Sequence, residues 1–287
     1  MSPSPLPSSS RSLVSTEWLA DHQLSPQVAV IDGSYFLPTM NRDATAEYLA
    51  GHIPGAIRFD IDQIADHSSS LPHMLPTAEA FATSVGALGI SDQDTIVVYD
   101  SVGLYSAPRV WWTFRVFGAE QVYILDGGLP KWKAEGRLIE TGMTTRPARS
   151  FKVRMRSDAV ASLGDVQTAL RSGSAQVVDA RSPERFRGDV PEPRPELRSG
   201  HMPGALNVHY ASVVVDGRLA SPQQLAAAFT AGGVDIDQPI ITSCGSGVTA
   251  AILSFALDAL GRSTARVYDG SWVEWGARAD LPVAKGE

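Results

Sequence analysis

The sequence predicts an α/β fold built from two similar domains, each a mostly parallel sheet with helices on both faces. Short apolar runs rich in Val and Ile alternate with segments of helical periodicity along the chain. Motifs of the first half also return in the second half in the same order. A length of 287 residues allows one large domain or two ordinary ones, and the repeated motifs favour two.

The internal duplication shows in several pairs of matching segments. The runs VVYDSVGLYSAPRVWWTFRVFG (97–118) and IITSCGSGVTAAILSFALDALG (240–261) align without gaps, and the same offset places LDGGLPKW (125–132) over YDGSWVEW (268–275). Upstream, VIDG (30–33) matches VVDA (177–180), and GHIPGAIRFD (51–60) matches GHMPGALNVH (200–209). The spacing between copies is far too long for a solenoid repeat, so we expect a duplicated domain.

Each half has its own alternation of strands and helices. In the first half we expect strands near 28–32, 57–59, 95–99 and 122–125, and helices near 77–87 and 107–117. In the second half we expect strands near 176–179, 206–209, 239–243 and 266–268, and helices near 162–171, 222–230 and 248–259. The predicted domains are residues 12–140 and 158–287, joined by a basic linker at 141–157.

Composition narrows the functional classes. A net charge of -7 and a pI near 5.4 argue against a general nucleic-acid binder. No apolar run is long enough to cross a membrane. Residues 1–11 are rich in Pro and Ser and resemble neither a secretory signal nor a mitochondrial presequence, so we expect a disordered tail. We expect a cytoplasmic protein, or a mitochondrial one if the source is eukaryotic.

The single cysteine, Cys244, lies where a predicted strand ends and a glycine-containing loop leads into a helix. One cysteine excludes an intramolecular disulfide and any CxxC pair. A free cysteine is most often a small buried hydrophobe. Here, however, loop N–H groups and the helix N-terminus favour a thiolate, which indicates a nucleophile. No His, Asp or Glu cluster has metal-ligand spacing and no cofactor motif is present, so we expect neither metal nor cofactor.

The first half serves as an internal comparison for this loop. In the gapless alignment Ser101 falls at the position of Cys244 and is preceded by Asp100. The scaffold is therefore retained in the first half without its thiol. We expect any chemistry to belong to the second half, with the first half as a supporting wall.

The chain resembles two-domain rhodanese-type sulfurtransferases from about Leu13 to Ala284. The resemblance is carried by HIPGA, LYSAPRVWW, LDGG, VVDAR, PEPR, GHMPGALN, CGSGVTA and YDGSWVEW. The CGSGVT loop is similar to the 3-mercaptopyruvate branch of the family. The resemblance implies that Cys244 takes the sulfur of 3-mercaptopyruvate as a persulfide and passes it to thioredoxin, a small thiol or cyanide. It also implies that the loop residues Gly245, Gly247, Val248 and Thr249 contact the substrate.

Further residue roles also follow from the resemblance. The family's substrate-carboxylate arginines match Arg185 and Arg194, and a guanidinium suits a carboxylate because it binds in a bidentate fork. Ser246, His73 and Asp62 match a proposed relay that moves a proton as pyruvate leaves. Residues present in both halves are interpreted as scaffold: His52 and His201 in the GHxPGA turns, and Asp126 and Asp269 in the loops.

Three alternative functions remain open at this stage. A thiosulfate sulfurtransferase typically has two cationic residues directly after the cysteine, where this chain has Gly245 and Ser246. A Cys-dependent phosphatase needs an arginine six residues after the cysteine, where this chain has Ala250. A persulfide carrier or sensor would use the same thiol without turning over a small donor.

Overall fold

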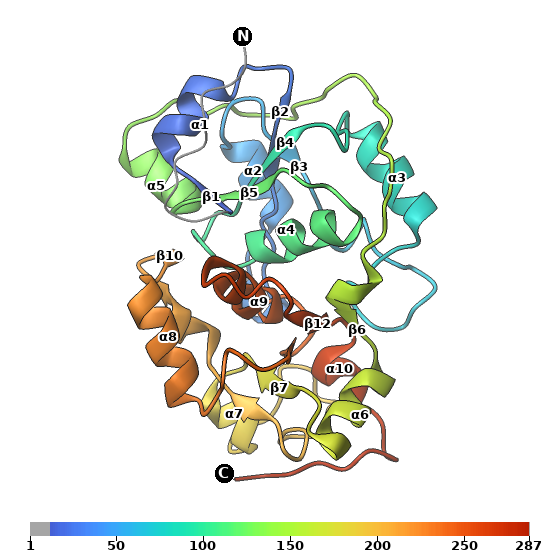
Figure 1. The fold of residues 1–287 in the computed structure, drawn as a ribbon. Coiled ribbons are helices and arrows are strands. Elements are labelled where there is room, and N and C mark those ends of the chain that lie inside the picture. Colours follow the sequence, from blue (N-terminus) through green and yellow to red (C-terminus); the bar gives the residue numbers. More distant parts are fainter. Residues whose placement is uncertain (1–11, 287) are drawn as a thin grey trace.

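Each half of the chain forms a five-stranded sheet in which all neighbouring strands are parallel (Figure 1). The computed structural model describes residues 12–286, so the predicted tail at 1–11 lies outside the described residues. The first sheet has the order β1-β5-β4-β2-β3 and the second β6-β12-β11-β7-β8. The two orders correspond strand for strand. The predicted fold class and the duplication are therefore confirmed.

The strands of the first sheet are β1 (Leu13–Val14), β2 (Val28–Asp32), β3 (Ile57–Arg58), β4 (Thr95–Tyr99) and β5 (Val122–Leu125). Those of the second are β6 (Val160–Ala161), β7 (Gln176–Asp179), β8 (Leu206–Asn207), β11 (Ile240–Ser243) and β12 (Arg266–Tyr268). A small antiparallel hairpin, β9 (Val214–Val215) with β10 (Arg218–Leu219), lies outside both sheets. The central strands agree with the sequence prediction, whereas β1, β6 and the hairpin were not predicted.

Helices cover both faces of each sheet. The first half contains α1 (Thr16–His22), α2 (Ala44–Ala50), α3 (Ala78–Ala87), α4 (Ala107–Val116) and α5 (Gly128–Ala134). The second contains α6 (Leu163–Ser172), α7 (Pro183–Arg187), α8 (Pro222–Ala231), α9 (Ala250–Ala259) and α10 (Ser271–Trp275). Two of the longer helices, α6 and α8, begin at capping boxes, in which Ser162 pairs with Asp165 and Ser221 with Gln224.

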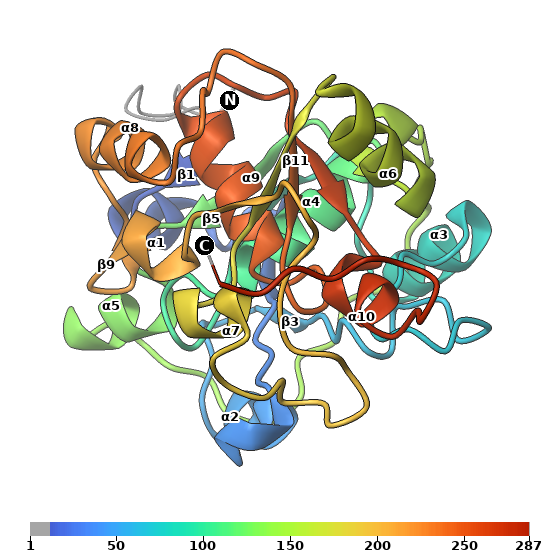
Figure 2. The same ribbon diagram turned by 90° about the horizontal axis from the view of Figure 1, so that it is seen from below.

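The two halves meet through their inner helices. Figure 1 shows α4 and α9 in the middle of the molecule, and Figure 2 shows α8 and α9 beside each other when the second half is viewed from below. One continuous core contains residues of both halves, including Phe114 of α4 and Phe255 of α9. Trp111 meets Phe255 edge to face at 5.0 Å. The two halves therefore share a buried apolar surface.

Two smaller cores lie on the outer faces of the sheets. In the first half, Val97 and Leu125 of the sheet pack with Trp132 of α5. In the second half, Ile241 of the sheet packs with Trp272 and Trp275 of α10. The predicted linker at 141–157 runs along the first half in Figure 1, and Arg149 forms an ion pair with Asp94 there at 2.6 Å. No helix within residues 12–286 is long and apolar enough to span a bilayer.

Strand register corrects the gapless alignment at the cysteine by one residue. Asp32 pairs with Tyr99 across the first sheet, and the equivalent Asp179 pairs with Ser243 across the second. Tyr99 therefore corresponds to Ser243. The residue that corresponds to Cys244 is Asp100, and the alignment to Ser101 was wrong. The first-half loop contains one additional residue before its helix, which a gapless alignment cannot show.

Candidate active site

Cys244 lies at the carboxyl end of β11, at the start of the loop that leads into α9. Cys244 is 2% exposed, and its Sγ accepts a hydrogen bond from the Gly247 N–H at 3.2 Å. The backbone of Cys244 is also held, since its N–H donates to Ser271 Oγ at 3.2 Å and its carbonyl accepts from Trp272 N at 3.0 Å. The sulfur is therefore fixed relative to the loop that surrounds it.

The equivalent loop of the first half, between β4 and α4, binds an anion with its backbone N–H groups. The buried carboxylate of Asp100 accepts five backbone hydrogen bonds at distances of 2.7 to 2.9 Å. The donors are the N–H groups of Val102, Gly103, Tyr105, Ser106 and Ala107. Such converging N–H groups form an anion-binding nest. In the first half, the protein's own carboxylate fills the nest.

In the second half the equivalent nest contains no carboxylate. Within the described chain, no acceptor is bound by the backbone N–H groups of Gly245, Ser246, Val248, Thr249 or Ala250. These groups are available to an anionic sulfur on Cys244 and to a group attached to it. N–H donors around a sulfur stabilise the thiolate, which is the nucleophilic form of a cysteine.

Two glycines in the loop leave room for arginine side chains. Gly247 has φ +80°, and a Cβ there would lie 2.6 Å from Arg109 Nη1. A Cβ on Gly245 would lie 3.1 Å from Arg185 Nη2. The second contact places the guanidinium of Arg185 directly beside the loop that holds Cys244.

Arg185 is held in place by a buried carboxylate. Glu192 accepts hydrogen bonds from Arg185 Nε at 3.1 Å and from Arg185 Nη2 at 2.5 Å. The same carboxylate accepts from Arg181 at 2.9 Å, and Arg181 also binds Asp179. Because charge-assisted forks are directional, Glu192 fixes the plane of the Arg185 guanidinium. Arg187 is paired with Asp189 nearer the surface, at 2.8 Å, and does not line the Cys244 cavity.

Arg194 reaches the same cavity from a separate loop. The cavity has a volume of about 220 Å³, and Arg185, Arg194, Cys244, Ser246 and Thr249 are among the residues that line it. The positive charge of Arg194 lies near the Tyr35 hydroxyl of the first half, where it partly offsets the rise in the Tyr35 pKa that burial causes. Among residues 12–286, no carboxylate lies within ion-pair distance of Arg194. Its charge is therefore available to a bound anion.

Of the three predicted relay residues, the structure brings His73 and Asp62 into contact. His73 Nδ1 lies 2.5 Å from Asp62 Oδ1, and this contact with His73 is the main reason that the pKa of Asp62 is lowered. His73 is buried, and its Nε2 has no hydrogen-bond partner in the described part of the chain. Ser246 is buried and lines the cavity, but within residues 12–286 no hydrogen bond joins it to His73. The relay therefore remains a proposal.

Several residues at the site were not predicted from the sequence. Leu37 and Tyr105 of the first half line the cavity, as do His209 and Tyr210 of the second. Burial raises the pKa of Tyr35 to about 12 and also raises that of Tyr105, so both hydroxyls are neutral at physiological pH. Burial lowers the pKa of His209, and Arg185 adds to this effect. No periodicity or motif spacing in the sequence places these side chains, several of which come from the first half, around Cys244.

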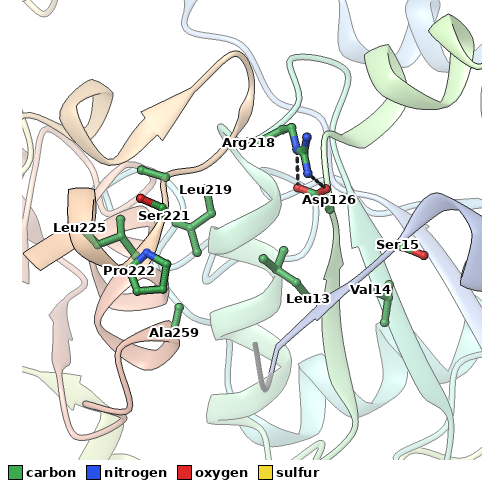
Figure 3. Close-up of a pocket in the computed structure, with 11 residues that line it drawn as sticks. Leu13, Val14, Ser15, Asp126, Arg218, Leu219, Ser221, Pro222, Leu225 and Ala259 are labelled. Carbon is green, nitrogen blue, oxygen red and sulfur yellow. Dashed lines mark hydrogen bonds and ion pairs between the residues drawn. The ribbon is translucent and has the colours of Figure 1, made fainter. Parts of the chain in front are cut away.

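A second cavity, of about 350 Å³, lies elsewhere between the halves (Figure 3). Its lining includes Leu13 and Val14 of β1 and Pro222 and Leu225 of α8, with the Asp126–Arg218 ion pair beside them. It contains none of the predicted site residues. Across the described residues, no group of three or more His, Cys, Asp or Glu side chains is arranged to hold a metal ion.

Comparisons with known proteins agree with this architecture. The family model "Rhodanese-like domain" matches residues 15–135 and 162–278. The Escherichia coli 3-mercaptopyruvate sulfurtransferase is 47% identical over 94% of this chain and 96% of its own length. The human 3-mercaptopyruvate sulfurtransferase is 40% identical over 94% and 93%. An Arabidopsis thaliana protein named thiosulfate/3-mercaptopyruvate sulfurtransferase 1 is 40% identical over 98% and 80%.

Solved structures show the same arrangement of the whole chain. The crystal structure of SseA from E. coli, described as a 3-mercaptopyruvate sulfotransferase, has a TM-score of 0.84 at 44% identity and covers 91% of this chain and 98% of its own. Tum1 from Saccharomyces cerevisiae has a TM-score of 0.86 at 29% identity, covering 96% and 98%.

Proposed function

The chain belongs to the rhodanese-like family, and we propose that it transfers sulfur from 3-mercaptopyruvate to a thiol or cyanide acceptor through a persulfide on Cys244. The observation that carries this proposal is the unfilled N–H nest around Cys244, with Arg185 beside it. The nest suits an anionic sulfur, and the arginine suits the carboxylate of a small acid donor.

The first step forms the persulfide. The Cys244 thiolate attacks the donor sulfur, an S–S bond forms, and the donor C–S bond breaks. The electron pair of that bond stays with the donor carbon and gives the enolate of pyruvate, which takes up a proton to become pyruvate. We assign the supply of this proton to Ser246, His73 and Asp62, supported by the 2.5 Å contact of His73 with Asp62 and by the place of Ser246 in the cavity wall.

The second step regenerates the enzyme. An acceptor nucleophile attacks the outer sulfur of the persulfide, the S–S bond breaks, and its electron pair returns to Cys244 Sγ as thiolate. The nest N–H groups, including those of Gly245, Val248 and Thr249, stabilise the anionic sulfur in both forms. One cysteine is sufficient because no protein disulfide forms.

Arg185 and Arg194 are assigned to the donor. Their guanidinium groups line one cavity with Cys244, and they suit a carboxylate with an adjacent carbonyl oxygen. We propose that they orient the donor so that its sulfur meets Sγ. The sulfonate of thiosulfate would favour cations directly after the cysteine, and Gly245 and Ser246 supply none.

The physiological acceptor and the compartment belong to the same proposal. Thioredoxin, a small thiol and cyanide are all nucleophiles that remove a persulfide sulfur. A reducing compartment such as the cytoplasm would keep Cys244 free between turnovers.

Donor competition tests the proposed function. Thiocyanate formation is measured with 3-mercaptopyruvate and with thiosulfate at matched concentrations, with cyanide as acceptor and Cys244→Ser as control. We expect 3-mercaptopyruvate to be strongly preferred and the variant to be inactive. A preference for thiosulfate would overturn the donor, and absence of turnover with both donors would favour a carrier or sensor.

A further inference from the structure

We propose that Arg109 is a positioning residue that holds His73 of the first half against the Cys244 loop of the second half. The proposal rests on the proposed function for its kinetic consequence, but its structural part stands on the contacts of Arg109 alone. Arg109 lies on α4 and is almost completely buried. A buried guanidinium with several directed contacts fixes the groups around it more strongly than an exposed one.

Arg109 contacts both halves of the site. Its Nη2 donates to the His73 carbonyl at 2.5 Å, and its Nη1 lies 2.6 Å from Asp269 Oδ1. Nη1 also donates to the Gly247 carbonyl at 3.4 Å. The guanidinium stacks over the ring of Trp112 at 4.7 Å, which sets its plane. One side chain thus connects the loop of His73 with the loop of Cys244.

Asp269 of the second half binds both Arg109 and the segment that contains His73. Its Oδ2 accepts from the Leu75 backbone N–H at 2.8 Å, while its Oδ1 binds Arg109. Residues 73–75 are therefore held at both ends by one buried ion pair. This support matters because His73 has φ +60°, a left-handed conformation that a non-glycine residue adopts at a cost in free energy.

Gly247 links Arg109 to the loop that holds Cys244. Its N–H donates to Cys244 Sγ, and its carbonyl faces Arg109. That carbonyl shares a peptide unit with the Val248 N–H, which is one of the unfilled nest donors. A cation at the carbonyl oxygen polarises the peptide and strengthens its N–H as a donor. Arg109 therefore affects both the histidine and the anion nest without touching the substrate.

The duplication supplies a comparison within the same molecule. Asp126 is the first-half counterpart of Asp269, and it also binds an arginine of the other half, Arg218, in a fork of 3.0 and 2.5 Å (Figure 3). The side chain of Arg218 is 55% exposed, and the Cys244 cavity is not lined by it. The two ion pairs both join the halves, but only the buried Arg109–Asp269 pair contacts the reactive loop. Arg218→Met is therefore a matched control for loss of an interdomain ion pair.

The first experiment measures the position of His73 without any activity. The histidine side chains are labelled with ¹³C, and the His73 resonance, assigned by its loss in His73→Ala, is compared in wild type, Arg109→Met and Arg218→Met. We expect it to shift or broaden in Arg109→Met and to remain unchanged in Arg218→Met. An unchanged resonance in folded Arg109→Met would overturn the proposal, as would an equal change in both variants.

The second experiment is a double-mutant cycle in kcat. If Arg109 acts through His73, Arg109→Met should lower kcat by about 10- to 100-fold, because misplacement of a catalytic group by about 1 Å has effects of this size. KM for 3-mercaptopyruvate should change by less than about twofold, since donor binding is assigned to other arginines. Arg109→Lys should restore part of kcat, and the loss in the double variant with His73→Ala should be clearly smaller than the product of the two single losses, because part of the effect of Arg109 passes through His73.

The outcomes distinguish this inference from the proposed function. If the two single losses in kcat simply multiply in the double variant, the two residues act independently and the positioning role is overturned. Wild-type kcat in Arg109→Met or in His73→Ala would overturn it as well. If wild type turns over neither donor, the proposed function fails. The ¹³C resonance of His73 then decides the structural inference by itself.

Discussion

Arg185 is the residue whose role depends most clearly on its neighbours. Its guanidinium is held by Glu192, and the same carboxylate is bound to the fully buried Arg181. A fork that is fixed before the donor arrives loses little conformational entropy on binding. Arg194 differs, since no carboxylate among residues 12–286 lies within ion-pair distance of its guanidinium.

Replacement of these arginines should mainly weaken donor binding. We expect Arg185→Ala and Arg194→Ala each to raise KM for 3-mercaptopyruvate about tenfold or more, because each removes charged hydrogen bonds to a carboxylate. Arg187→Ala is the control, since Arg187 is paired with Asp189 away from the cavity. Steady-state kinetics check this. Unchanged KM in both variants, or an equal rise in the control, would contradict the assignment.

At the residue scale, the sequence predicted the nucleophile but not most of its surroundings. Cys244 was predicted because strand, glycine loop and helix are adjacent in the chain. Tyr35, Tyr105 and Arg109 were missed as site residues because they reach the site only when the halves pack together. The role of Asp269 was also underestimated: its presence in both halves suggested loop geometry, whereas it forms a buried ion pair between them.

At the scale of elements, the loop between β11 and α9 determines the chemistry. The equivalent loop in the first half is filled by the Asp100 carboxylate, which explains how the scaffold persists there without a thiol. The loop requires Gly247 for two reasons, its φ of +80° and the 2.6 Å approach of Arg109 Nη1 to a Cβ at that position.

Gly247→Ala separates these two requirements when it is compared with Gly261→Ala. Gly261 has the same φ of +80°, but a Cβ there would meet no atom within 4 Å. We expect Gly261→Ala to lose roughly 1 kcal/mol of unfolding free energy and to retain activity. Gly247→Ala should lose activity by about 100-fold or more, because the Cβ displaces Arg109 or the loop. Chemical denaturation and kinetics on both variants check this, and equal activity in the two would contradict it.

The long elements could be predicted and the short ones could not. The central strands β2, β4 and β11 are apolar runs between turn residues, and helices such as α9 show clear periodicity. Two-residue strands such as β1 and β6 are too short to carry a periodic signal, and pairing with a neighbouring strand defines them. The gapless alignment missed the additional loop residue because only sheet register reveals it.

At the scale of the whole molecule, the shared core makes the halves interdependent. Phe255 of α9 is completely buried and packs on Trp111 of α4 within a core that spans both sheets. The site itself is also divided, with Cys244 in one half and His73 in the other. We therefore propose that the two predicted domains fold as one cooperative unit.

Removal of this contact should destabilise the whole chain. We expect Phe255→Ala to lower the free energy of unfolding by about 3–5 kcal/mol, the usual cost of deleting a buried aromatic ring. Tryptophan fluorescence and far-UV circular dichroism should still report a single coincident transition in denaturant. Leu24→Ala, at an exposed position, is the control and should change little. Two separate transitions, with only one shifted by Phe255→Ala, would contradict the cooperative unit.

Direct detection of the intermediate tests the central claim, which is that Cys244 carries the transferred sulfur. The protein is mixed with an equimolar amount of 3-mercaptopyruvate without acceptor, then intact mass, tryptic peptides and released pyruvate are measured beside Cys244→Ser. We predict one additional sulfur atom per chain on the peptide containing Cys244, one equivalent of pyruvate, and loss of both in the variant. Pyruvate released without sulfur on Cys244, or equal release by Cys244→Ser, would contradict the account.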